Sequence, residues 1–362
     1  MRSGPGDRVT APRRRRAPRD ILISAAILTA LAAFAAVPGP APLAQAVPSA
    51  GGGPLTPVTI AYAAISASQA GAWVAKEEGI FAKHGLDATL TSIPGGSSPT
   101  AALISGKIDA LQISVEAIEA DLAGADIVYV AAPLSVPTFS FVTQPSITDP
   151  RQLKGQRVAM TGFGTATYYA AVIALRHFGL DPFKDVVLVR TGSLPAMVDA
   201  MKSGQIQAGA FSLPTLAEVQ AAGMRVMVNV ADLGIRYPSS WLTVTRAYAQ
   251  AHRPIVAAMV ASITEAIAFE QQHPARTIAV IAQYAHISDP NLLAQTYRAV
   301  ILQLNRVPLP APSEIRQALD LIAIRNPEAK GADPARFVDT SFVVQLEKDG
   351  FIDRLYKTPA GP

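Results

Sequence analysis

The sequence predicts an α/β protein of two similar lobes, each built on a mostly parallel sheet. The main observation is a pattern that occurs twice, SGKIDALQIS at residues 105–114 and SGQIQAGAFS at residues 203–212. In each copy a Gly, the usual end of a helix, precedes a short apolar strand that ends at a Ser. Each copy also follows a Gly-Ser-x-Pro step, at Gly96 and at Gly192. Because strand and helix patterns alternate around both copies, a parallel sheet is expected in each lobe.

The beginning of the chain has the composition of an export signal. Four consecutive arginines precede an apolar run over residues 21–37, and a small-x-small motif ends at Ala46. This arrangement is typical of a secretory signal peptide over residues 1–46, cleaved near Ala46, with residues 47–56 as a linker. The alternative is an uncleaved anchor, since an apolar run of this length lies at the lower edge of what spans a bilayer.

The positive charge of the full chain comes from this leader. The sequence has 31 basic and 27 acidic residues, and residues 1–46 hold seven of the basic and two of the acidic ones, so the rest has a formal charge of −1. This balance gives no indication of binding to nucleic acid or to a membrane surface. The absence of Cys excludes disulfides, thiolate metal sites and a lipid-modified Cys after the leader. We therefore expect the mature protein to be free in an exported compartment.

The first lobe is expected over residues 57–135. Its predicted strands cover residues 58–63, 86–91, 110–114 and 127–132. Its predicted helices cover residues 70–81, 100–105 and 117–124, and the first of them ends near Gly79.

The second lobe is expected over residues 136–240, after a break that Pro133 and Pro137 bracket. Its predicted strands cover residues 139–143, 157–160, 186–189, 208–211 and 225–229. Its predicted helices cover residues 166–178, 195–203 and 216–222.

Residues 241–362 are expected to form a return strand and a helical tail. The strand covers residues 241–245, and the helices cover residues 254–271, 275–284, 291–304, 313–325 and 340–349. We expect these helices to pack on the first lobe and the hinge, with little part in chemistry.

Two loops at strand ends predict a binding site between the lobes. Residues 162–167 (GFGTAT) lie between a strand and a helix, where free backbone N–H groups and the helix dipole favour an anion or a polar acceptor. Residues 95–98 offer the same arrangement from the other lobe. Open α/β sheets bind ligands at the carboxyl ends of their strands. Gly-rich turns of this kind also occur without any ligand, so the duplication is what favours a site.

Several motifs, in this order along the chain, resemble the periplasmic solute-binding proteins of ABC importers for nitrate, aliphatic sulfonates, taurine and thiamine-pyrimidine precursors. The resemblance covers residues 57–355. It rests on AWVAKEEGIFAKHGLD at 72–87, GGSSPTAALISGKIDA at 95–110, LKGQRVA at 153–159, LRHFGLDPFKDVV at 175–187 and FVVQLEKDGFID at 342–353.

The resemblance implies a periplasmic-binding-protein fold of type II, with two lobes joined by two hinge strands. It implies a periplasmic monomer that needs no cofactor. A small-molecule solute is expected to close the hinge, and an ABC permease in the inner membrane is expected to receive the solute. The ligand contacts of the family fall on Ser66, Ser68, Gln69, Gly96, Ser97, Ser98, Ser114, Glu116, Thr165, Thr167, Tyr168, Ser212 and Pro214, with Trp241 as a further candidate.

Other roles remain open for some of these residues. Ser114 and Ser212 suit strand-end caps, Tyr168 suits the core and Trp241 suits the hinge. Glu116 is the most informative, because a carboxylate facing the cleft would repel sulfonate or nitrate and suit an amine or a ring N–H. If Glu116 points outward, it is an acidic residue at a helix start.

The residue types favour an organic solute with a polar head and an apolar or aromatic body. Small hydroxyls and backbone amides bind such a head by hydrogen bonds, and the cleft loops contain no clear Lys or Arg. Arg190 and Arg236 are the nearest candidates for a cation.

Two other classes of function are alternatives. The eukaryotic pyrimidine-precursor synthases share this fold, but their chemistry is associated with a reactive His and a Cys-rich loop. The five histidines here are scattered, so neither a metal site nor catalysis is indicated. A periplasmic sensor or partner-presenting module is the other alternative.

Overall fold

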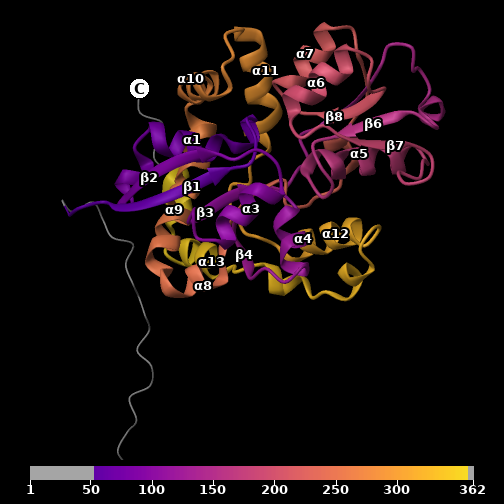
Figure 1. Ribbon diagram of the computed structural model, residues 1–362. Helices are drawn as coiled ribbons and strands as arrows, with labels where there is room; N and C mark the ends of the chain where they lie inside the picture. Colours follow the sequence, from indigo (N-terminus) through magenta and orange to yellow (C-terminus); the bar gives the residue numbers. More distant parts are fainter. Residues whose placement is uncertain (1–52, 358–362) are drawn as a thin grey trace, which may run out of the picture. The chain divides into compact units, whose positions relative to one another are not determined.

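Two five-stranded sheets form the framework of the protein in a computed structural model that describes residues 53–357 (Figure 1). The first sheet has the strand order β2-β1-β3-β10-β4 and defines lobe 1; the second has the order β7-β6-β8-β5-β9 and defines lobe 2. The strands are β1 (Thr56–Tyr62), β2 (Leu86–Ser92), β3 (Ala110–Ile113), β4 (Ile127–Leu134), β5 (Ser140–Thr143), β6 (Arg157–Met160), β7 (Val187–Arg190), β8 (Ala208–Phe211), β9 (Arg225–Asn229) and β10 (Ser240–Thr245).

The two sheets repeat one arrangement, which confirms the predicted duplication of mostly parallel sheets. In lobe 1, β1 runs parallel to β2 and β3, while β10 is antiparallel to β3 and β4. In lobe 2, β6 runs parallel to β7 and β8, while β5 is antiparallel to β8 and β9. The antiparallel strand therefore occupies the fourth position in both sheets.

Helices follow most strands. Those of the two lobes are α1 (Ala70–Glu77), α2 (Ile80–Lys83), α3 (Ser97–Ile104), α4 (Glu116–Leu122), α5 (Ala166–His177), α6 (Leu194–Lys202) and α7 (Thr215–Ala221). Those of the tail are α8 (Arg246–Ala251), α9 (Arg253–Gln272), α10 (Pro274–Ala285), α11 (Pro290–Val300), α12 (Pro312–Ile322), α13 (Ser341–Lys348) and α14 (Phe351–Lys357). Short 3-10 turns lie at Ala67–Gln69, Pro150–Leu153, Val230–Leu233, Ile301–Gln303, Pro327–Gly331 and Pro334–Phe337.

Local breaks account for the helices that differ from the prediction. The helix expected over 70–81 is divided into α1 and α2, because Gly79 adopts a left-handed conformation with φ of 67°. The helix expected over 291–304 ends as α11, and a 3-10 turn follows it. The sequence reading did not identify α8, and it expected the last helix to end at residue 349, where α14 follows after Gly350.

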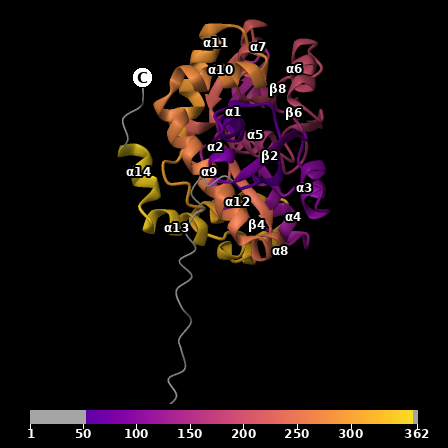
Figure 2. The same cartoon turned by 90° about the vertical axis from the view of Figure 1, so that its left-hand side faces the viewer.

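The tail covers lobe 1, with α9 as its central helix. α9 contacts α1, β4 and α13, and Figure 2 shows it among the first-lobe elements. Among the described residues α9 is the helix long and apolar enough to cross a bilayer, but most of it is buried inside the protein, as in a core helix. Its side chains join those of α1 and β1 in one apolar core.

Two crossing segments connect the lobes, and they pair with each other. The chain passes from β4 to β5 and later returns from β9 to β10. Tyr237 N donates to Ser135 O at 3.0 Å, which joins the two crossings. The Ser135 hydroxyl donates to Glu314 Oε2 of α12 at 2.6 Å, and the other oxygen of Glu314 accepts from Arg236 Nε at 2.8 Å. The tail thus anchors both crossings.

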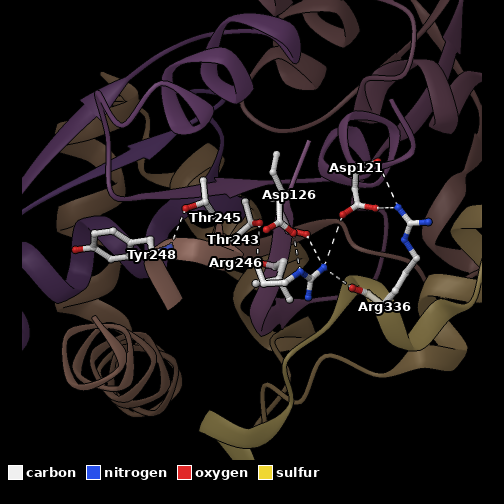
Figure 3. A network of polar contacts seen from close by, with 9 residues as sticks. Asp121, Asp126, Thr243, Thr245, Arg246, Tyr248 and Arg336 are labelled. Atoms are coloured by element: carbon white, nitrogen blue, oxygen red, sulfur yellow. Dashed lines mark hydrogen bonds and ion pairs between the residues drawn. The ribbon is translucent and has the colours of Figure 1, made fainter. Parts of the chain in front are cut away.

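A second polar network ties the end of β10 to the tail (Figure 3). Arg246 Nε donates to Asp126 at 2.7 Å, and its Nη2 donates to the carbonyl of Arg336 at 2.7 Å. Arg336 in turn forms an ion pair with the buried carboxylate of Asp121. Burial raises the pKa of Asp121, and the two guanidinium groups oppose that shift. The network gives a buried carboxylate the partners that it needs.

The predicted signal peptide at 1–46, its cleavage near Ala46 and the first part of the linker lie outside the described residues. The predicted domain boundaries stay a prediction.

Glu270 of α9 is an ionisable group with no solvent exposure. Both of its carboxylate oxygens lack a hydrogen-bond partner among the described residues, and one lies 3.9 Å from the position that a Cβ would take on Gly71. Burial raises its pKa to about 8, so the folded protein favours the protonated form.

Replacing Glu270 with Gln should remove a loss of stability at high pH. The folded pKa of about 8 lies above the ordinary value of 4.5. The stabilising effect of the protonated group is therefore complete below pH 4.5 and is lost as the pH rises through about 8. Urea unfolding should show that the wild type loses on the order of a few kcal/mol between about pH 5 and 9 that Glu270→Gln retains.

Glu328→Gln is the matched control, because Glu328 is exposed. It should keep the wild-type dependence of stability on pH. If Glu270→Gln also keeps the wild-type dependence, the buried carboxyl of Glu270 does not cause the loss of stability at high pH.

Candidate functional site

A cavity of about 470 Å³ lies at the carboxyl ends of strands from both lobes. Lobe 1 contributes Ala63 after β1 and Ser114 after β3, and lobe 2 contributes Thr161 after β6, Gly192 after β7 and Ser212 after β8. This is where open α/β sheets bind ligands. We take this cavity as the candidate site.

Many of the residues that the sequence singled out line this cavity. They are Ser66, Ser68, Gln69, Ser114, Glu116, Thr165, Thr167, Ser212 and Pro214. They come from four separate loops, which the fold brings together because the strands carrying them end at the same edges of the two sheets.

Tyr168 and Trp241 lie in the core and not on the cavity. Tyr168 is 2% exposed on α5. Trp241 is fully buried, packs edge-on against Tyr129 at 5.2 Å and donates from Nε1 to Ser135 at 3.2 Å. Tyr168 follows the lining residue Thr167 in α5, and one helical step turns its side chain by about 100° from that of its neighbour.

Gly96, Ser97 and Ser98 also lie outside the lining. Ser97 and Ser98 are exposed in the first turn of α3. Gly96 has a different role, because a Cβ at this position would lie 2.8 Å from Glu116 Cγ. A side chain on Gly96 would therefore displace Glu116.

The carboxylate of Glu116 connects the two lobes. Glu116 begins α4 in lobe 1, and its Oε1 accepts a hydrogen bond of 3.2 Å from the N–H of Ala166, the first residue of α5 in lobe 2. Its Oε2 is buried and has no partner in the part of the chain that the structure describes. Burial raises the pKa of Glu116 to about 7, although the N–H groups of Glu116, Ala166 and Ser114 oppose the shift.

Glu119, one turn further along α4, makes a second contact between the lobes. Its carboxylate accepts a hydrogen bond from the hydroxyl of Tyr169 in α5. It also lies directly against Gly164, whose φ of +75° suits glycine and whose missing side chain leaves room for the carboxylate. Gly96 and Gly164 therefore permit the close approach of α4 to the start of α5.

Three hydroxyls from the loop before α5 and from its first turn bind one another. The Oγ1 atoms of Thr161, Thr165 and Thr167 lie 2.9 to 3.0 Å apart. Thr165 also caps α5 and donates to the carbonyl of Gly162 at 2.7 Å. These contacts hold the loop in the form that presents the Ala166 N–H to Glu116.

The ionisable residues of the lining are Glu116, Glu218 and His286. Glu218 forms an ion pair of 3.6 Å with Lys202, which lies outside the lining. Neither cation that the sequence suggested is part of the lining: Arg236 binds Glu314, and the Nε of Arg190 lies 3.8 Å from the position of a Cβ on Gly162.

The sequence reading missed several lining residues. Phe139 comes from the crossing between the lobes, and Ser193 caps α6. His286 ends α10 with a φ of 55°, the one positive φ of a non-glycine residue among residues 53–357. The Gly192-Ser193 step was visible in the sequence. His286 carried no signal, because only the packing of the tail brings it to the cavity.

No cluster of three or more His, Asp or Glu side chains suited to a metal is present among the described residues. His84, at the end of α2, is buried and bonded to Glu265 at 2.8 Å, away from the cavity.

The chain is similar to one protein family and to many solved structures. The model of the NMT1/THI5-like family matches residues 66–277. The comparison with curated proteins finds no match. Three of the similar structures illustrate the range.

The first is the alkanesulfonate-binding protein SsuA of Xanthomonas axonopodis pv. citri, solved with MOPS bound. It is 19% identical, with a TM-score of 0.67, over 79% of this chain and 99% of that chain. The second is the periplasmic nitrate-binding protein NrtA of Synechocystis PCC 6803, 13% identical, with a TM-score of 0.69, over 84% of this chain and 92% of that chain.

The third is a Candida albicans protein described as having the generic periplasmic binding protein fold. It is 16% identical, with a TM-score of 0.64, over 79% of this chain and 97% of that chain. At these identities the likeness establishes the fold, as the sequence motifs predicted.

Replacing Gly96 with Ala should destabilise the protein through Glu116. The φ of Gly96 is −100°, so the backbone accepts Ala without strain and the effect comes from the contact of 2.8 Å with Glu116 Cγ. Overpacking of this kind costs about 1–3 kcal/mol, which urea unfolding would measure. Ser97→Ala, at the exposed neighbour, should stay within about 0.5 kcal/mol of the wild type. Equal stability of Gly96→Ala and the wild type would contradict the contact.

Proposed function

The chain belongs to the NMT1/THI5-like family, and we propose on this basis that it is the solute-binding component of an ABC import system. It captures a small organic solute between lobe 1 and lobe 2 in the periplasm and delivers it to the permease. The observation that carries this proposal is the cavity at the strand ends of both lobes. A ligand there contacts both lobes at once.

Hinge closure is the proposed mechanism. A solute that touches both lobes binds the closed form better than the open form, and so shifts the population toward closure. The two crossing segments are paired at Ser135 and Tyr237 and anchored by Glu314, so bending is concentrated between that point and lobe 2. The contacts of Glu116 and Glu119 with α5 form only when the lobes approach.

An organic solute fits the lining better than a small inorganic ion. The cavity wall is mainly apolar, with Ile65, Ile113, Phe139, Leu194 and Pro195 among its side chains. The polar side chains of the lining expose little of their surface, as in sites that hold an apolar body and orient it by a few hydrogen bonds. Alkanesulfonate and nitrate are in the names of two similar proteins, and the lining itself does not favour them.

Closure by a solute can be measured in solution. The chain without residues 1–46 is screened by thermal shift against sulfonates, taurine, nitrate, aminopyrimidines, flavins and aromatic carboxylates. A ligand at 100 times its Kd should stabilise the protein by about 2.7 kcal/mol. Small-angle X-ray scattering with that ligand should then show a smaller radius of gyration, because the lobes close.

Two results would contradict the proposal. A ligand that raises the melting temperature without reducing the radius of gyration would exclude closure. A ligand that is chemically changed on incubation with the protein would favour the synthase-like alternative. Mass spectrometry in the same experiment therefore checks that the ligand is recovered unchanged.

A further inference from the structure

Three buried polar atoms on the cavity lining have no partner in the described part of the chain. They are Glu116 Oε2, Gln69 Oε1 and Ser212 Oγ. The Nε2 of Gln69 already donates to Ser240 at 3.1 Å, which leaves its Oε1 as an acceptor. Gln69 and Ser212 are 4% and 2% exposed. Buried polar groups are almost always hydrogen-bonded, so a bound molecule is the natural partner of these atoms.

Two of the three atoms need a hydrogen-bond donor, and the third can also accept from one. A carboxylate oxygen and an amide oxygen accept hydrogen bonds, and a serine hydroxyl can do either. Leaving such an acceptor unpaired in a buried site costs about 1–3 kcal/mol. A ligand that offers N–H groups removes this cost, whereas a ligand that offers only oxygen acceptors leaves it in place.

The charges of the lining point in the same direction. Glu116 and Glu218 are its carboxylates, and no Lys or Arg is part of it. Lys202 pairs with Glu218 from outside the lining, which leaves Glu116 as the carboxyl group without a cationic partner there. Because its pKa is raised to about 7, Glu116 is partly ionised at neutral pH. A cationic head group beside it would favour the ionised form, and an anionic one would be repelled by that form.

One place where an anion would be expected is already filled. The start of α5 is a helix N-terminus on the cavity, as is the start of α6 at Ser193 and Leu194, and such an end binds anions. Glu116 Oε1 takes the Ala166 N–H at the start of α5. The protein thus supplies its own carboxylate at this N-terminus.

We infer that the solute is an N–H donor, an organic cation or amino-heterocycle with an apolar body, and that Glu116 and Gln69 recognise its N–H groups. This inference rests on the proposed function and names the class of its solute. One carboxylate oxygen of Glu116 binds lobe 2 while the other binds the solute, so the residue that selects the solute also connects the lobes.

Matched probes test the charge and the donor separately. Benzamidine, benzoate and benzenesulfonate share one ring and differ in the head group, and 4-aminopyrimidine and 4-methoxypyrimidine differ in a single N–H donor group. The protein is purified from the periplasm after expression of the full chain, and binding is followed by thermal shift and calorimetry. Benzamidine should bind at least about tenfold more tightly than benzoate and benzenesulfonate, and 4-aminopyrimidine at least about tenfold more tightly than 4-methoxypyrimidine.

Glu116→Gln tests the residue itself. The Gln side chain can still accept from Ala166 N–H, but its NH₂ places a donor where the free oxygen stood. Affinity for benzamidine should fall about tenfold or more, and the preference for benzamidine over benzoate should shrink. Asp199→Asn, an exposed carboxylate outside the cavity, removes the same charge and should stay within about twofold of the wild type. Circular dichroism and the melting temperature confirm that both variants are folded.

The outcomes separate this inference from the proposed function. Tighter binding of benzoate, benzenesulfonate or nitrate than of benzamidine overturns the inference, while the role in solute binding stands. Unchanged benzamidine affinity in folded Glu116→Gln also overturns it. Each probe is also tested at roughly 10 mM, about ten times the Kd of a weakly binding fragment. If no probe of either class binds at that concentration, both the inference and the proposed function are contradicted.

Discussion

The hydrogen bond from the Ala166 N–H to the carboxylate of Glu116 is the contact on which the arrangement of the cavity depends. It brings the start of α4 in lobe 1 to the start of α5 in lobe 2. The approach is possible because Gly164 has no side chain where Glu119 lies, and the side chain of Glu116 has room because Gly96 has none. The bond satisfies an N–H that the helix itself leaves free, and it directs the second oxygen of Glu116 to a buried position without a partner. The geometry of one carboxylate thus determines both how the lobes meet and what the cavity presents.

The tail has a larger part in this arrangement than its sequence indicated. Glu314 of α12 binds Ser135 and Arg236, one from each crossing. Asn305 adds a hydrogen bond of 3.0 Å to Ser135. Because the crossings are fixed at this point, the hinge closure that we propose would bend the chain beyond it. The tail also brings His286 to the edge of the cavity, in a backbone conformation that is costly for a non-glycine residue.

Proteins named for binding alkanesulfonate or nitrate share this fold, but the fold alone does not select a ligand. In this chain the lining carries carboxylates and hydroxyls and no Lys or Arg. The N-terminus of α5 is bound by Glu116. Selectivity in such a site comes from a few buried polar atoms, since the apolar wall accepts many bodies of suitable size.

The sequence by itself determined the duplicated α/β pattern, the helical tail and the loops that line the cavity, because hydrophobic periodicity, Gly and Pro are local signals. Thr165 and Ser212 lie in motifs identified from such signals, since strand ends are visible in a sequence, whereas Ser66 was identified from the family resemblance. The tertiary structure alone decided that β5 and β10 run antiparallel, that Trp241 is buried and that Gly96 lies against Glu116. It also decided which oxygens remain unpaired. These features depend on contacts between residues far apart in the chain, and a local pattern carries no information about the partner that packing provides.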